Sequence, residues 1–321
     1  MKWMRVLWYA VAANSGHTEH IFRQLPTAAI LPRVKLVIPS GSYIDLDSLK
    51  TETKSTGIEK DRLLISQNAV LITQQCKQAE LNTGLIHDIG STGSGTGATV
   101  QNRINRNATQ ITCAKDCNEL KAYVVHNLAE ILNASLAKHE RIILEGTQGF
   151  GLSLLHSPFY PFVTSRDTPA AAFVAEAGLS PRDVDDIVLV IRAYPIRVAG
   201  SSGPLPNEIT WESLTQEGDF QEPIQEYTSV THKLRRVAKF DPEIVKQAIL
   251  HNQPTRIVLN HVDYVKKEIN ENTQAINQFI QNIEQSIGRS IDFIGLSPKD
   301  LHSINVYYSH ASIHNEMLSS T

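Results

Sequence analysis

The chain has 321 residues, of which 41% are hydrophobic and 20% are charged, so it can bury a substantial core as a globular protein. Its formal net charge is -3, with 30 Lys and Arg against 33 Asp and Glu, which leaves no basic surplus for a nucleic-acid partner. No uninterrupted apolar run is long enough to cross a bilayer, and the first residues lack the apolar core of a signal peptide, so we expect a cytoplasmic protein without a membrane partner.

Short apolar runs bounded by turn residues predict a series of strands in the first quarter of the chain. They lie at residues 6–9, 34–38, 62–65 and 69–72, and helix-forming residues at 45–51 predict the start of a helix. Three cysteines, an odd number, occur at Cys76, Cys113 and Cys117. Because the last two have helical spacing rather than that of a zinc knuckle, we expect reduced thiols that hold no metal.

A polar loop with a single histidine follows the first predicted strand. It reads Asn14-Ser15-Gly16-His17-Thr18, and its small residues can place an imidazole against a ligand. Taken alone, such a histidine is more often a surface or capping residue than a catalyst.

The densest glycine cluster of the chain is Gly-Ser-Thr-Gly-Ser-Gly-Thr-Gly at residues 90–97. Backbone N–H groups and hydroxyls at this density can surround a phosphate, although such a segment can also be a flexible connector. Apolar residues near helical spacing then predict a helix over residues 118–139, which leads into a short buried strand at 141–144.

Three glycines follow that strand in the string Glu-Gly-Thr-Gln-Gly-Phe-Gly-Leu-Ser, residues 145–153, and Tyr-Pro-Phe-Val-Thr-Ser follows at 160–165. The glycines let the backbone turn sharply and approach a ligand. Gln148 and Thr164 are presented beside this turn, and an amide and a hydroxyl can each donate to or accept from a purine edge or a phosphate.

The second half of the chain continues the alternation of strands and helices. A continuous apolar run at 187–191 predicts a strand covered on both faces. Further strands are predicted at 256–259 and 291–294, and helices at 241–251 and 274–287. This rhythm predicts an α/β fold with a mostly parallel central sheet flanked by helices, in a single domain over residues 1–321 with a C-terminal tail from about residue 303.

The strings at residues 145–153 and 160–165 together resemble the signature of the adenylosuccinate synthetase family, particularly its short archaeal-type and phage-related forms. Several other motifs occur in the order of that family. They are the histidine loop, the glycine cluster, Arg-Val followed by Gly-Pro-Leu-Pro-Asn-Glu at 203–208, the basic string at 231–236, and an aspartate after the strand at 256–259.

The resemblance implies roles for residues of this chain. Gln148 and His17 are expected to be catalytic, His17 as the general acid of phosphoryl transfer, and the carbonyl of Gly16 is expected to bind Mg²⁺. The expected ligands of inosine monophosphate and L-aspartate are Asn14, Thr92, Gln148, Thr164, Thr231, Lys233, Arg235 and, from the other subunit of a homodimer, Arg106. The expected ligands of GTP are Thr18, Arg235, His261 and Asp263, with the Asp263 carboxylate accepting from the N1 and 2-amino groups of guanine. From the residues alone, Asp263 could instead be a helix cap and Arg106 could lie on a solvated helix face.

The chain also departs from the family pattern. Lys233 replaces the first of four arginines, which removes the bidentate fork that suits a carboxylate. His232 replaces a glycine, His261 stands in for a lysine, and the loop at 199–202 is longer. The family's Gly-Asp-Glu-Gly-Lys-Gly phosphate loop, with the aspartate expected to be the general base, does not occur in the sequence. Either the reading frame starts late or the chain is a degenerate homologue.

Three functions therefore remain open. The first is a ligase that joins inosine monophosphate and L-aspartate with hydrolysis of GTP, through a 6-phosphoryl intermediate. The second is a phage-type enzyme that joins aspartate to a guanine nucleotide to make 2-aminoadenine precursors. The third is a catalytically inactive nucleotide-binding homologue.

Overall fold

A computed structural model describes residues 2–5, 11–15, 18–228, 232–267, 273–297 and 300–307. The chain forms two compact units, Met1–Val184 and Asp185–Thr321, which are described separately below. The expectation of one domain over residues 1–321 stays a prediction, and most of the expected tail after residue 303 falls outside the described residues.

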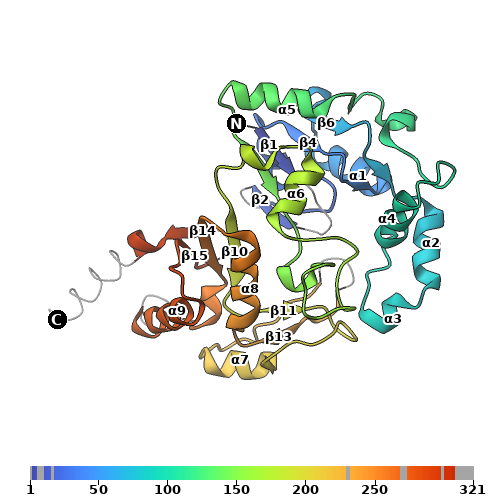
Figure 1. Ribbon diagram of the computed structural model, residues 1–321. Helices are drawn as coiled ribbons and strands as arrows, with labels where there is room; N and C mark the ends of the chain where they lie inside the picture. Colours follow the sequence, from blue (N-terminus) through green and yellow to red (C-terminus); the bar gives the residue numbers. More distant parts are fainter. Residues whose placement is uncertain are drawn as a thin grey trace. The chain divides into compact units, whose positions relative to one another are not determined.

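The first unit contains short parallel strands with helices around them (Figure 1). Its largest sheet is parallel, in the order β4-β6-β8, and β9 pairs in parallel with β1, as β7 does with β5. The hairpin of β2 and β3 is antiparallel. The strands are β1 (Lys2–Arg5), β2 (Val11–Ser15), β3 (Thr18–Phe22), β4 (Leu36–Ile38), β5 (Tyr43–Ile44), β6 (Leu63–Ser66), β7 (Val70–Leu71), β8 (Val124–Val125) and β9 (Ile142–Glu145).

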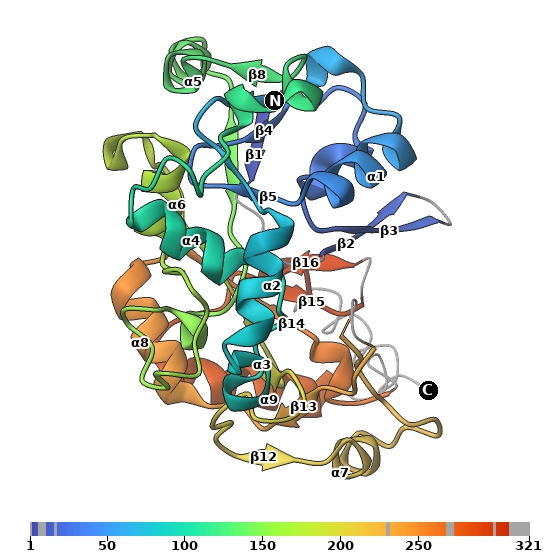
Figure 2. The ribbon, with the colours of Figure 1, turned by 90° about the vertical axis from the view of Figure 1, so that its right-hand side faces the viewer.

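The helices of this unit begin and end at residues suited to those positions. The Asp45 side chain accepts a hydrogen bond from the backbone N–H of Ser48 at the start of α1, which ends at Gly57 with φ 63°. Helices α2 and α4 lie side by side in both ribbon views (Figure 2). The helices are α1 (Leu46–Thr56), α2 (Gln74–Asn82), α3 (Leu85–Ile89), α4 (Thr96–Ile104), α5 (Leu128–Ala137) and α6 (Ala170–Ala177).

The second unit is built on a four-stranded sheet in the order β10-β14-β15-β16. The first three strands are parallel and β16 is antiparallel to β15, while a small antiparallel sheet has the order β11-β13-β12. The strands are β10 (Val188–Arg192), β11 (Ile196–Arg197), β12 (Glu208–Ile209), β13 (Arg236–Ala238), β14 (Arg256–Asn260), β15 (Phe293–Gly295) and β16 (Leu301–Ser303), and the helices are α7 (Trp211–Glu217), α8 (Pro242–Asn252) and α9 (Thr273–Ile287).

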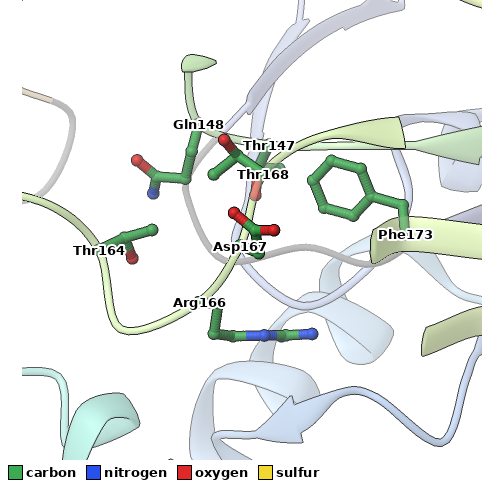
Figure 3. A pocket seen from close by; sticks show the side chains of 7 residues that line it. All are labelled: Thr147, Gln148, Thr164, Arg166, Asp167, Thr168 and Phe173. Atoms are coloured by element: carbon green, nitrogen blue, oxygen red, sulfur yellow. The ribbon is translucent and has the colours of Figure 1, made fainter. Parts of the chain in front are cut away.

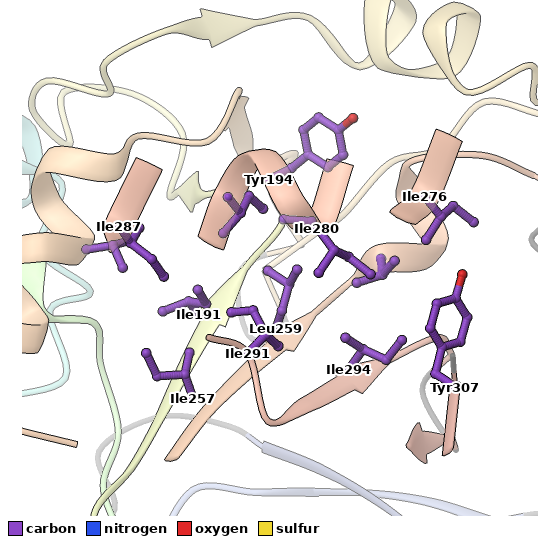
Figure 4. Packing of buried hydrophobic residues seen from close by; sticks show 14 of the residues in the cluster. Ile191, Tyr194, Ile257, Leu259, Ile276, Ile280, Ile287, Ile291, Ile294 and Tyr307 are labelled. Atoms are coloured by element: carbon purple, nitrogen blue, oxygen red, sulfur yellow. The ribbon is translucent and has the colours of Figure 1, made fainter. Parts of the chain in front are cut away.

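The core of the second unit is rich in isoleucine (Figure 4). Helix α9 buries Ile276, Ile280, Ile283 and Ile287, whose spacing of three or four residues places them on one face. This face packs against side chains of the four-stranded sheet and its neighbouring loops, namely Ile191, Ile257, Leu259, Ile291 and Ile294. The periodic sequence therefore fixes which side of α9 covers the sheet.

The α/β class and the parallel pairing of strands are confirmed. Two predictions were wrong: the length of one helix and the burial of one strand. Of the helix expected over 118–139, only α5 is α-helical, because residues 124–125 pair with β6 as a strand. Strand β10 is not covered on both faces, since Val188 and Val190, which alternate along it, are 49% and 57% exposed. No helix in the described parts of the chain combines the length and the apolar character needed to cross a membrane.

Candidate functional site

The glycine turn after β9 is shaped by packing against α6. A Cβ built on Gly146 would lie 2.5 Å from the ring of Phe173, so a larger residue would force the turn away from the helix. At the end of β9, the carboxylate of Glu145 accepts from the Thr27 hydroxyl at 2.9 and 3.0 Å. Two residues after Gly146, Gln148 has φ 73°, a backbone conformation that non-glycine residues adopt at some cost in free energy. The start of the turn is thus held by Thr27 and by the packing of α6, and Gln148 follows it with a positive φ.

A small cavity of about 10 Å³ lies beside this turn, which is room for about one water molecule. Its lining combines the turn with residues 164–168 and with α6 (Figure 3). The amide Nε2 of Gln148 and the hydroxyl of Thr147 are buried, and neither has a hydrogen-bond partner among the described residues. The lining residues are Thr147, Gln148, Thr164, Arg166, Asp167, Thr168 and Phe173. The structure thus brings Gln148 and Thr164, which the sequence singled out, to the lining of one small cavity, where a buried amide and a buried hydroxyl have no partner among the described residues.

Backbone hydrogen bonds hold the loop at residues 164–168 against the turn. The N–H of Thr164 donates to the Leu152 carbonyl at 2.9 Å, and the N–H of Leu154 donates to the Arg166 carbonyl at 3.1 Å. The Thr168 hydroxyl donates to the Gly149 carbonyl at 3.3 Å. The two loops therefore form one unit, so the positions of their side chains depend on each other.

Arg166 lines the cavity and was not identified from the sequence. Its guanidinium forms an ion pair with Glu176 on α6 and lies over the Tyr43 ring, 5.1 Å from the centroid. Burial lowers the pKa of Arg166 to about 9, and the neighbouring charge of Arg103 acts in the same direction. The sequence signal for this residue was a charged side chain in the small polar string Thr-Ser-Arg-Asp-Thr. Its partners could not be read from that string, because Glu176 belongs to the following helix and Tyr43 to a distant part of the chain.

The glycine cluster ends at the N-terminus of α4, where Gly93 has φ 64° and the N-cap Gly95 has φ 82°. A Cβ built on Gly97 would lie 3.6 Å from that of Ser165, so the start of α4 adjoins the loop at 164–168. The free N–H groups of the first turn of a helix suit an anion. The Glu80 side chain on α2 is buried and accepts from the Ser91 hydroxyl at 2.9 Å, which holds the start of the cluster.

Other predicted ligand residues of the first unit, for the substrates or for GTP, either are not among those that line the cavity or lie outside the described residues. Thr92 is exposed on the glycine cluster, and Arg106 is exposed after the end of α4. Asn14 and Thr18 belong to β2 and β3, which pair on either side of the histidine loop. Gly16, His17 and Thr231 lie outside the described residues, so their roles stay predictions.

A second group of predicted residues lies in the second unit, where β14 ends. His261 has φ 62° and precedes the 3-10 turn Val262–Tyr264, with its ring centroid 5.0 Å from that of Tyr264. Burial, followed by the charge of Arg192, lowers the pKa of His261 to about 4. Burial likewise raises the pKa of Asp263. Because Asp263 lies inside the turn and His261 is its N-cap, the helix-cap interpretation of Asp263 is wrong.

The residues of the basic string differ in whether a carboxylate neutralises their charge. Arg236 donates to both carboxylate oxygens of Glu208 and to the Gly203 carbonyl at 2.7 Å, so its guanidinium is occupied. Arg235 forms no ion pair within the described parts of the chain, although its Nε donates to the Tyr227 carbonyl at 3.4 Å, and Lys233 is exposed. His232 has φ 48°, so it keeps the left-handed conformation that suits the glycine it replaces.

Among the described residues, no group of three or more His, Cys, Asp or Glu side chains could hold a metal ion. The expected magnesium ligand Gly16 is not among them. The described side chains therefore do not form a magnesium site by themselves.

Comparison with known proteins gives consistent results. The family model for adenylosuccinate synthetase matches residues 6–124 and 112–272. The adenylosuccinate synthetase of Pyrococcus horikoshii is 32% identical over 310 residues, which cover 92% of this chain and 88% of that protein. That of Methanocaldococcus jannaschii is 33% identical over 312 residues, covering 92% and 87%.

Two solved structures are also similar. The succinoaminodeoxyadenylate synthetase of cyanophage S-2L, bound to dGMP and to dATP as an energy donor, has a TM-score of 0.78 and 26% identity, covering 97% of this chain and 91% of the other. The fully ligated adenylosuccinate synthetase of Plasmodium falciparum has a TM-score of 0.80, with 94% and 93% covered, and at 17% identity it supports the fold alone. With the family match extending over most of its length, the chain belongs to the adenylosuccinate synthetase family.

Proposed function

We propose that this chain is a ligase that joins inosine monophosphate to L-aspartate with hydrolysis of GTP. The observation that carries the proposal is the buried amide of Gln148, which has no partner among the described residues and lines the same small cavity as Thr164. The adjoining N-terminus of α4 supplies N–H groups that suit the phosphate of a nucleotide. Family membership supplies the reaction class.

The proposed role of Gln148 follows from the donor at its Nε2. Transfer of a phosphoryl group to the purine oxygen requires that the purine lose its N1 proton to a base, a role that the family assigns to the aspartate of the phosphate loop and that is assigned to no residue of this sequence. As that proton leaves, negative charge develops on the oxygen, and an N–H aimed at that oxygen would stabilise the charge. In a buried site the stabilisation is larger than in water, because no solvent competes for the donor. His17, as general acid, would donate a proton in the transfer of the phosphoryl group.

The proposed nucleotide reader is Asp263 in the second unit. An ionised carboxylate accepts two hydrogen bonds from N1–H and the 2-amino group of guanine, a pair that adenine does not offer. Burial raises the pKa of Asp263 from its ordinary value of 3.8, and ligand donors would favour the ionised form. Arg235, without an ion pair among the described residues, would bind a carboxylate or phosphate oxygen.

Replacing Asp263 by Asn tests this assignment. One acceptor becomes a donor, so affinity for GTP should fall and affinity for XTP should rise, because xanthine has a carbonyl in place of the 2-amino group. Equilibrium binding of GTP, ATP, ITP and XTP to the parent and D263N proteins measures the change. If the parent protein does not prefer GTP over ATP, Asp263 does not read guanine.

A second candidate is the phage-type reaction on a guanine nucleotide. It is favoured by the likeness to the cyanophage synthetase, whose structure holds dGMP and dATP. Assays with aspartate and each pair of nucleotides separate the two, since IMP with GTP should be turned over in the first case and dGMP with dATP in the second. Binding of nucleotides without turnover of either pair would identify the third possibility, an inactive homologue.

Magnesium is part of the proposal as the ion that accompanies the triphosphate, and no described side chain is assigned to it. Mg²⁺ bound to substrate phosphates would neutralise the charge that develops during transfer. Titration of Mg²⁺ into the assay, with EDTA as the control, tests the requirement. A homodimer in which Arg106 reaches the phosphate bound by the other subunit completes the proposal.

A further inference from the structure

Glu226 is one of four residues in the second unit whose contacts form a closed ring. Its carboxylate accepts a hydrogen bond from the Tyr264 hydroxyl at 3.1 Å. The Tyr264 ring meets the Trp211 ring edge to face at 6.4 Å, and Trp211 Nε1 donates to the Arg235 carbonyl at 2.6 Å. The Arg235 N–H donates back to the Glu226 carbonyl at 2.8 Å. Both backbone polar groups of Arg235 are thus fixed by the ring.

The ring is anchored to the end of β10. Arg192, the last residue of that strand, forms an ion pair with Glu226, and its Nε donates to the Tyr194 carbonyl at 3.2 Å. The side chains of Arg192 and Glu226 are 26% and 19% exposed, so the pair is shielded from water and stronger than a surface pair. The carboxylate therefore accepts from two donors that belong to separate elements.

The ring joins two segments that have different ligands in the proposed function. One segment would bind the purine base and the other a carboxylate or phosphate. Tyr264 ends the short turn that contains Asp263, and Arg235 precedes β13 in the basic string. The neighbouring Arg236 is held by Glu208, which leaves Arg235 as the arginine of this pair without an ion pair in the described part of the chain. The turn is thus linked to Arg235 by contacts through both Glu226 and Trp211.

We propose that Glu226 is a positioning residue that couples the Asp263 turn to Arg235, so that the nucleotide base and the ligand of Arg235 are bound cooperatively. The proposal rests on the proposed function, because it takes the purine base as the ligand of Asp263 and an anionic group as the ligand of Arg235. Its physical basis is that Glu226 serves both loops, because its carboxylate accepts from Tyr264 and its backbone carbonyl accepts from Arg235. Loss of the carboxylate charge would loosen the contacts with Tyr264 and Arg192, and through the backbone of Glu226 it would also affect the position of Arg235.

Glu226→Gln and Tyr264→Phe test the coupling. Calorimetric titration should show GTP and L-aspartate each binding about tenfold more weakly to E226Q, and Y264F should change both in the same direction by a smaller factor. Glu243→Gln is the matched control, because Glu243 pairs with Lys246 on the surface of α8 and its side chain is 74% exposed. This control should bind both ligands as the parent protein does.

A double variant separates positioning from general loss of stability. If Glu226 acts through the Asp263 turn, the loss of GTP affinity in E226Q/D263N should be smaller than the combined losses of the two single variants, whereas independent effects add. Y264F removes a single hydroxyl and keeps the test usable if E226Q does not fold.

The outcomes distinguish failure of the proposed coupling from failure of the proposed function. Parent-like binding of both ligands to Y264F and E226Q, or a loss confined to one ligand, would overturn the coupling and leave the proposed function intact. A parent protein that binds neither GTP nor L-aspartate would overturn both.

Discussion

Gln148 combines an unfavourable backbone conformation with a buried amide whose Nε2 has no partner among the described residues. A non-glycine residue at positive φ costs on the order of 1–3 kcal/mol, so substitutions here separate stability from binding. We expect Q148A and Q148G both to weaken inosine monophosphate binding by about 1 kcal/mol, the value of one neutral hydrogen bond, while Q148G is the more stable of the two. Calorimetry and urea denaturation measure these effects. Unchanged binding in both variants would mean that the amide is structural.

His261 makes stability depend on pH because its pKa is lowered to about 4 from 6.5, by burial and then by Arg192, with Glu226 opposing. Between these values the unfolded chain binds a proton that the folded protein does not, so this contribution to stability is complete above about pH 6.5 and is lost as the pH falls toward 4. His261→Asn should flatten that dependence, since Asn accepts the left-handed conformation without titrating. Thermal unfolding of the parent, H261N and a control, H87N at an exposed site on α3, measures the slope. Equal slopes in parent and H261N would contradict the assignment.

At the scale of elements, the packing of the β9 turn against α6 depends on the absence of a side chain at Gly146. A methyl group there would lie 2.5 Å from the Phe173 ring, and its accommodation should cost about 1–3 kcal/mol, as overpacking generally does. G146A should therefore lower the free energy of unfolding, and the double variant G146A/F173L should recover part of the loss because a smaller side chain makes room. Denaturant unfolding of the three variants checks this. A double variant less stable than G146A would show that the clash is relieved elsewhere.

Helices and strands were predicted well where the pattern of apolar residues within the element was enough to identify it. The isoleucines of α9 and the apolar runs of β4, β6, β9 and β14 carry their periodicity in the sequence. The helix expected over 118–139 was too long because helical spacing of apolar residues does not reveal that Val124 and Val125 pair with β6. Strand β10 was expected to be covered on both faces, but a continuous apolar run does not reveal whether other elements cover each face, and Val188 and Val190 are exposed.

At the scale of the whole molecule, the proposed homodimer predicts complementation between inactive variants. Each R106A or D263N dimer should lose activity, but a mixed dimer would contain one site with the parent Asp263 and the parent Arg106. Mixing the unfolded variants and refolding them together should restore at most about a quarter of the parent activity, since half of the dimers are mixed and each has one complete site. Sedimentation equilibrium gives the subunit number. A monomer, or no recovery on mixing, would place Arg106 outside the site.

The sequence by itself determined the family and the α/β class, because the glycine strings and the order of the motifs are local features of the chain. It also identified Gln148 and Thr164, which meet at one cavity. Only the tertiary structure decided which charged side chains are engaged in contacts within the protein. Arg236 is held by Glu208, Arg166 by Glu176 and Tyr43, and Glu226 by Arg192 and Tyr264. These partners are 10 to 123 positions apart, and no periodic pattern encodes such pairs, since their strength depends on burial that only the folded chain creates.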